Sequence, residues 1–276
     1  MAVLNDIDIK VSYVYIVLSV FAIAMLASLR KEKVLNSFNV SLLTGTISLI
    51  GYDIVQYFLT RYDNGELSSQ TQALLEVVVD SCQALWALSY LYFSFVRSST
   101  QLDAMFPWTY KLVSSCWAVP LSIFLIPVLL AVIKLINIDA FKASGKSEFF
   151  WYQCSQILCT ITLAAFDTLF LVCFVRYLRR TQVDLSVPID PAFVLISRYG
   201  MLASGACFLT VPLWSTNPYY WPFYLIETSA YSCLMNFVVA VLFAMKVSLR
   251  HMYDNVNSSH TSGGSRQTSK NPPSTI

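Results

Sequence analysis

Charged residues are scarce in this sequence, and their scarcity excludes an ordinary soluble domain. Asp, Glu, Lys and Arg make up 12% of the 276 residues, whereas hydrophobic residues make up 56%. A soluble domain carries about 25% charged residues, which keep its surface in contact with water. The formal net charge is only +2, so we expect no nucleic-acid partner. The composition instead predicts a protein whose main partner is the lipid bilayer.

Histidine is also rare, and the common catalytic motifs are missing. The two histidines, His251 and His260, follow the last long apolar segment. None of the seven cysteines has the spacing of a metal site. The chain contains no G-x-S-x-G, H-E-x-x-H or P-loop pattern. We therefore expect neither an enzyme nor a bound cofactor or metal.

What the chain does have is a series of long apolar segments. A helix needs about 20 apolar residues to cross the hydrocarbon of a bilayer. Segment 191–213 is the weakest candidate because it contains Arg198, but leaving it out would expose a long apolar loop to water. The sequence thus predicts an all-α, integral, multi-pass membrane protein with a seven-transmembrane helix bundle in residues 1–250. The seven predicted spans are roughly 11–29, 38–60, 72–96, 109–136, 150–175, 191–213 and 219–245.

The distribution of Lys and Arg predicts the orientation of the bundle. Cytoplasmic loops of membrane proteins carry the excess of these residues. Five lie on one side: Lys10, Arg61, Lys134, Lys142 and Lys146. We therefore predict that the N terminus is outside and the C terminus is cytoplasmic. The ten basic residues on the predicted cytoplasmic side are Arg30, Lys31, Lys33, Arg97, Lys111, Arg176, Arg179, Arg180, Lys246 and Arg250.

Residues 251–276 differ from the rest of the chain because they are polar and rich in Ser and Thr. Such a composition is typical of a disordered segment. The last residues, Ser274-Thr275-Ile276, match the S/T-x-apolar ending that PDZ-like grooves bind by strand addition. We predict a disordered cytoplasmic tail that contacts a PDZ-like partner or another cytoplasmic effector.

Ionisable residues within the predicted spans are costly to insert and usually functional. Four are acids in the outer half of the membrane: Asp53, Glu76, Asp80 and Glu227. In a rhodopsin-shaped bundle, spans two, three and seven are neighbours, which gathers these acids around one cavity. Such a cavity is expected to bind a small cationic ligand, a cation or a proton. The alternative is a structural network of hydrogen bonds made by protonated carboxyl groups.

Two further ionisable residues, Asp167 and Arg198, lie slightly inward of the midpoint of consecutive predicted spans. Consecutive helices usually pack as neighbours, and a charge inside the membrane usually has a partner of opposite sign. We therefore predict that Asp167 and Arg198 form an intramembrane ion pair.

Other polar side chains recur at helical spacing around the acids. Lipid cannot satisfy their hydrogen bonds, so these stripes must face the interior of the bundle. The predicted stripes are Thr46, Asp53 and Gln56 in span two; Glu76, Asp80, Gln83 and Tyr90 in span three; and Gln153, Gln156, Thr160 and Asp167 in span five.

Two families of seven-span membrane proteins, the G-protein-coupled receptors and the microbial rhodopsins, have sequence motifs that can be compared with this chain. The cytoplasmic end of span three lacks the acid that precedes the arginine in G-protein-coupled receptors, since Val96 precedes Arg97. The run from Glu227 to Tyr231 is similar to the retinal-binding run of microbial rhodopsins, but Tyr231 stands where the retinal lysine would be. Neither set of family motifs is therefore complete, and a retinal Schiff base is excluded.

The predicted topology favours a receptor-like protein, in which a ligand enters from the outside or lumen and the helices signal to the cytoplasm. The alternative is a proton- or cation-coupled transporter or channel that uses the outer acids. A retinal-free opsin-like protein or a structural membrane protein is a further alternative.

Overall fold

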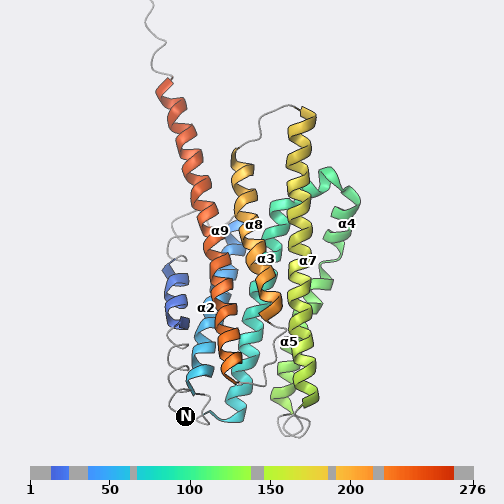
Figure 1. Cartoon of the computed structure of the whole chain (residues 1–276), viewed down its shortest axis with the longest axis vertical. Helices are drawn as coiled ribbons and strands as arrows, with labels where there is room; N and C mark the ends of the chain where they lie inside the picture. The colour runs from blue at the N-terminus through green and yellow to red at the C-terminus, as the bar shows by residue number, and fades with distance from the viewer. Residues whose placement is uncertain are drawn as a thin grey trace, which may run out of the picture.

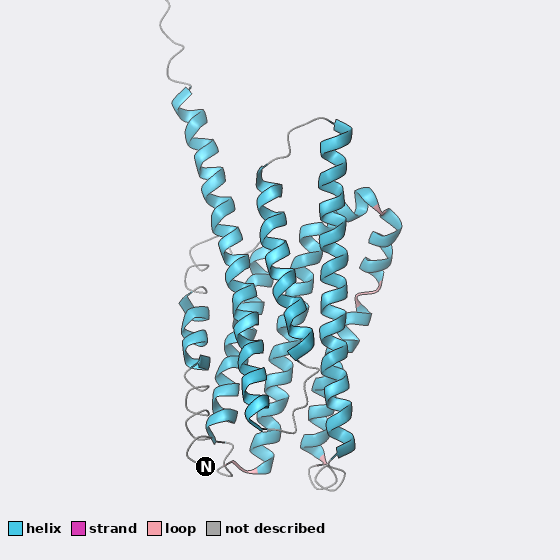
Figure 2. Cartoon of the chain, viewed as in Figure 1, coloured by secondary structure: helices cyan, strands magenta, loops and turns pink. Residues whose placement is uncertain are grey.

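The structure is a computed structural model, and it describes residues 14–24, 37–62, 67–137, 146–185, 191–213 and 221–263. These residues form helices without any strand (Figure 1 and Figure 2). A helix over Val14–Ala24 comes first. The longer elements are α2 (Ser37–Tyr62), α3 (Ser69–Met105), α4 (Pro107–Ser115), α5 (Ala118–Ile136), α7 (Lys146–Leu185), α8 (Pro191–Leu213) and α9 (Trp221–Gly263).

Six helical segments are long and apolar enough to cross a membrane, which is the pattern of an integral multi-pass membrane protein. They correspond to six of the seven predicted spans, including the one that contains Arg198. The first predicted span, 11–29, lies only partly within the described residues. The six segments are Asn39–Arg61, Ser69–Ser99, Pro107–Ile136, Phe150–Arg180, Pro191–Leu213 and Ile226–Met252.

A proline sets the boundary between α3 and α4. The residue before a proline avoids the helical backbone conformation, and Phe106, which precedes Pro107, has φ −142° and ψ 70°. At its other end α3 begins at a serine cap, where Ser68 Oγ accepts a hydrogen bond from the backbone N–H of Thr71 at 3.2 Å. Both ends of this long helix therefore follow from local sequence.

The last helix is longer than the sequence predicted. α9 continues to Gly263, past residue 250, where we expected the bundle to end and a disordered tail to begin. The first part of residues 251–276 is thus helical. The PDZ-like ending lies outside the described residues, so that prediction stands untested.

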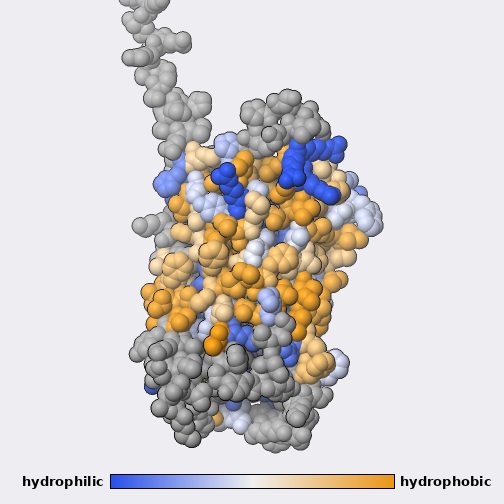
Figure 3. Space-filling view, viewed as in Figure 1, coloured by the Kyte–Doolittle hydropathy of each residue, from blue (hydrophilic) through white to orange (hydrophobic). Residues whose placement is uncertain are grey.

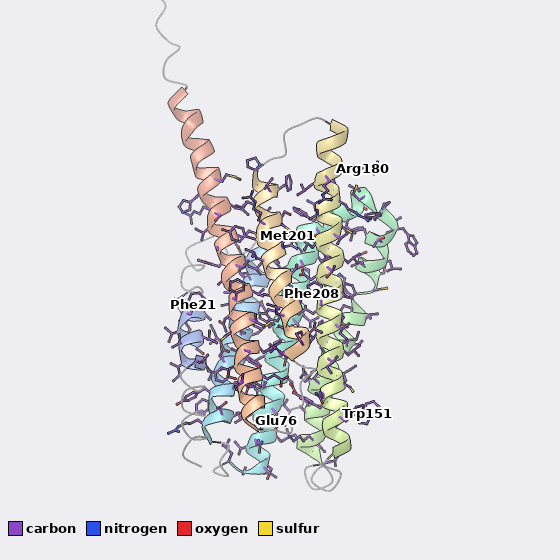
Figure 4. All side chains as sticks on the ribbon, in the orientation of Figure 1. Phe21, Glu76, Trp151, Arg180, Met201 and Phe208 are labelled. Carbon is purple, nitrogen blue, oxygen red and sulfur yellow. The ribbon has the colours of Figure 1, made fainter. Side chains whose placement is uncertain are left out.

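α3 is the central helix of the bundle. It packs against α2, α4, α5 and α7, while α8 packs against α7 and α9, and α9 returns to α2. The helices α2, α3, α7, α8 and α9 therefore form a closed ring, with α5 placed against α3 and α7. We call the two ends of the bundle the Glu76 end, where Trp151 also lies, and the Arg180 end; Figure 4 labels all three residues.

The bundle has apolar side chains on its surface and polar side chains in its interior. Ile47, Leu129 and Phe208 are 48–58% exposed, whereas Asp53 and Gln156 are almost completely buried. This arrangement confirms that the polar stripes face inward, as expected for helices surrounded by lipid. Figure 3 shows the apolar side chains as a band across the molecule, with hydrophilic side chains gathered near the Arg180 end.

Candidate functional site

The best-defined candidate site surrounds Asp80, which is 2% exposed in the Glu76 half of α3. Its Oδ1 atom accepts two hydrogen bonds from α7, one from Tyr152 Oη at 2.6 Å and one from Gln156 Nε2 at 3.2 Å. Gln83 Nε2 donates to Gln156 Oε1 at 3.1 Å and so orients this amide. The Oδ2 atom of Asp80 is buried and has no hydrogen-bond partner among the described residues. One face of a buried carboxyl group is therefore left without a partner.

A small cavity lies beside Asp80. The space open to a water-sized sphere is about 20 Å³, which is enough for one water molecule or one small ion. Side chains of α3, α5, α7, α8 and α9 line it, so the cavity lies between these helices and is only partly enclosed. Its polar lining consists of Asp80, Gln83, Gln156, Thr160, Thr210 and Tyr231.

The α5 wall of this cavity contains Pro127. A proline inside a helix removes one backbone N–H and leaves the carbonyl four residues earlier without its helical partner. That carbonyl belongs to Ile123, and it accepts a hydrogen bond from the Cys159 thiol of α7 at 3.4 Å. Cys159 thus compensates for the proline, as neighbouring helices do in membrane proteins.

Glu76, one helical turn before Asp80, has a charged partner of its own. It forms an ion pair with Lys134 of α5, and both side chains are about 30% exposed. The sequence placed Lys134 near the end of a span but did not pair it with Glu76. The charge of Lys134 also acts on Asp80, although no basic side chain among the described residues forms an ion pair with Asp80.

Asp53 and Glu227 lie away from the cavity. Asp53 is fully buried on α2, where Oδ1 accepts from Ser232 Oγ and Oδ2 accepts from Asn236 Nδ2 at 3.0 Å, both in α9. Glu227 is also buried on α9. Neither residue lines the cavity beside Asp80. Of the four predicted cation-binding acids, the structure therefore brings only Asp80 to that cavity.

The predicted ion pair between Asp167 and Arg198 is wrong, because the two side chains face different surroundings. Asp167 is 1% exposed and accepts hydrogen bonds from Ser94 Oγ of α3 at 2.9 Å and from Ser204 Oγ of α8. Arg198 is exposed. It lies six residues before Ser204, which rotates it by about 120° around α8 from the face that meets α7. Asp167 and Arg198 lie at similar depth in the membrane, but their helices do not turn these two side chains toward each other.

Arg97, which the sequence placed only at the cytoplasmic end of a span, has a buried guanidinium group toward the Arg180 end of α3. All three nitrogens of the Arg97 guanidinium group are buried without a hydrogen-bond partner among the described residues, and its Cζ atom lies 5.8 Å from the centre of the Phe93 ring. The group packs directly against α8 at Gly200, where an added methyl group would lie 2.6 Å from Arg97 Nη1. A methyl group at Gly200 would therefore displace the guanidinium end of Arg97.

One polar stripe runs along almost the whole of α3. The stripe predicted from Glu76 to Tyr90 continues at the same helical spacing to Ser94 and Arg97 and ends at Gln101, which is buried. Extending that spacing by two turns would have identified Ser94 and Arg97 from the sequence. The stripe joins the Asp80 cavity at one end of the bundle to the Arg97 contact at the other.

Comparison with known proteins adds nothing to this geometry. No protein-family model matches the chain, and no curated protein shows significant sequence similarity to it.

Proposed function

We propose that this chain is a receptor-like membrane protein with seven spans, which senses a ligand from the Glu76 end and signals at the Arg180 end. The observation that carries the proposal is the polar stripe of α3. Through Asp80 the stripe contacts α7, and through Ser94 it meets Asp167 and the α7–α8 contact. A change at the cavity therefore has a route along α3 to the contact of three helices near the middle of the bundle, and from there to Arg97 toward the Arg180 end.

The orientation that this proposal needs is the one predicted from the basic residues, with the Glu76 end outside and the Arg180 end in the cytoplasm. Protease protection tests it. A tag placed before residue 11 should be cleaved by protease added outside sealed cells, whereas a tag after residue 263 should be cleaved only when the membrane is opened. The same response from both tags would place them on one side and would mean an even number of spans.

Coupling between the two ends is tested with the purified protein in lipid nanodiscs. Asp80→Asn should change the hydrogen-exchange rates of backbone amides at the Arg180 ends of α7 and α8. Gln70→Glu is the matched control, because Gln70 is an exposed residue near the start of the same helix. Exchange at the Arg180 end that is the same in wild type and Asp80→Asn would remove the receptor-like proposal.

A proton- or cation-coupled transporter or channel is the second candidate, and the size of the cavity favours it. Pockets for organic ligands usually measure about 300–1,000 Å³, whereas this cavity holds one water-sized particle. The test is flux of sodium or protons into vesicles that contain the reconstituted protein. Flux that requires Asp80 would favour the transporter over the receptor.

A further inference from the structure

We infer that the Asp80 cavity is a site for one monovalent metal cation of about the size of sodium. The inference deepens the proposed function and rests on it, since it names what occupies the cavity. The first observation is the unpartnered Oδ2 atom of Asp80. Both side-chain donors that reach this carboxyl group, Tyr152 and Gln156, bind the other oxygen. A buried carboxylate oxygen needs a donor, a proton or a cation.

Two hydroxyl groups of the cavity lining, those of Thr160 and Thr210, offer oxygen lone pairs rather than hydrogens. Thr160 Oγ1 donates its hydrogen to the carbonyl of Gln156 at 2.8 Å, and Thr210 Oγ1 donates to the carbonyl of Cys207 at 2.6 Å. Gln83 donates through Nε2 to Gln156 and is also hydrogen-bonded to Tyr231. Three oxygens of the lining residues, Asp80 Oδ2, Thr160 Oγ1 and Thr210 Oγ1, therefore have no hydrogen left to donate. A water molecule can donate only two hydrogen bonds, whereas a cation can bind all three oxygens.

Charge and size restrict which cation fits. The polar lining includes one carboxyl group, from Asp80, and Glu76 nearby is already paired with Lys134. One positive charge balances one carboxylate. A calcium ion takes six to eight oxygen ligands, commonly from several carboxylates, and a magnesium ion keeps several waters. A cavity of about 20 Å³ leaves no room for such a shell. Hydroxyl, amide and carboxylate oxygens are suitable ligands for a small hard cation.

The test compares thermal unfolding of the purified protein in sodium chloride and in choline chloride at equal ionic strength. Choline carries the same charge but is too large for the cavity. Sodium at 100 times its dissociation constant should raise the Tm of the wild type by about 5–10 °C. Binding of radioactive sodium should saturate at one ion per chain.

Three variants show which residues the sodium effect requires. Asp80→Asn should lose the sodium effect. Asp53→Asn should keep it, because the other buried aspartate has partners for both oxygens. Thr160→Val keeps the carboxylate and removes one oxygen ligand, so it should raise the sodium concentration for half-maximal stabilisation by about tenfold or more; this variant decides the matter if Asp80→Asn does not fold. Equal unfolding of the wild type in sodium and choline would overturn the inference, as would an unchanged sodium response in Asp80→Asn or Thr160→Val.

The failure of the cation site and the failure of the proposed function give different results. If sodium stabilises the wild type but not Asp80→Asn, and hydrogen exchange at the Arg180 end is the same in both proteins, the cation site is supported and the receptor-like function is contradicted. If Asp80→Asn alters hydrogen exchange at the Arg180 end but sodium does not stabilise the wild type, coupling between the two ends is supported and the cation site is contradicted.

Discussion

Asp53 and Asp80 are both buried in the Glu76 half of the bundle, but their surroundings differ. Asp53 has a partner for each oxygen, and both partners come from α9, so the carboxyl group joins two helices. Asp80 has two partners for one oxygen and none among the described residues for the other, and a cavity lies beside it. The sequence placed these two acids in one class. The difference teaches that complete pairing marks a structural carboxyl group, whereas incomplete pairing next to a cavity marks a binding group.

The largest effect is expected at the fully paired residue. Asp53→Leu should lower the free energy of unfolding by about 3 kcal/mol, because the buried Ser232 hydroxyl would lose its acceptor and the buried Asn236 amide one of its two acceptors. Unfolding by a denaturing detergent, followed by helical circular dichroism, measures the loss. A variant as stable as wild type would show that Asp53 does not join α2 to α9.

Gly200→Ala should cost about 1 kcal/mol, because the added methyl group would displace the guanidinium end of Arg97, which its flexible side chain allows to move away from α8. Gly205→Ala is the matched control on the same helix, since a methyl group there would meet nothing within 4 Å. Alanine favours helix over glycine by about 1 kcal/mol, so the control should be neutral or more stable. Equal unfolding in the two variants would mean that Arg97 has room to move.

Asp80→Asn should change the free energy of unfolding in the opposite direction to Asp53→Leu. In the absence of sodium we expect a gain of about 1 kcal/mol, since the amide keeps an acceptor for Tyr152 and turns a donor toward the oxygens of the cavity. The same detergent titration, performed in choline chloride, measures this change. A large loss of stability would place Asp80 in the same structural class as Asp53.

The smallest effect is expected at the Ile123 carbonyl group, which Pro127 leaves without its helical hydrogen-bond donor. Cys159→Ala should cost about 0.5–1 kcal/mol because the carbonyl of Ile123 would lose its donor. Cys159→Ser should restore part of the loss, since its hydroxyl group donates more strongly than a thiol. Indistinguishable Tm values for the alanine and serine variants would show that the thiol contributes only its volume.

The sequence located six of the apolar segments because a bilayer requires about 20 apolar residues to cross it, although the segment 109–136 forms two helices, α4 and α5. It also predicted which stripes face inward, since lipid cannot satisfy polar groups. Even the span with Arg198 was correct. These predictions depend on length, polarity and helical spacing, which can be read one segment at a time.

The partners of the interior residues could not be predicted in this way. Arg198 and Ser204 lie on one helix, and only the rotation of α8 decides which of them meets Asp167. Likewise, the pairing of Glu76 with Lys134 depends on where α5 lies beside α3. Rotation and neighbours are properties of the whole bundle, so depth alone led us to the wrong partner for Asp167.

The length of α9 sets how far from the membrane its end is held. The membrane-crossing part ends at Met252, and the helix continues to Gly263. At about 1.5 Å per residue, this extension measures about 16 Å. A helix of that length acts as a spacer, and it separates Gly263 from the apolar part of α9 by more than the thickness of a headgroup layer, about 5–8 Å. A protein that captured the C-terminal sequence would therefore not need to touch the bilayer, and shortening the helix by two turns would draw it inward by about 11 Å.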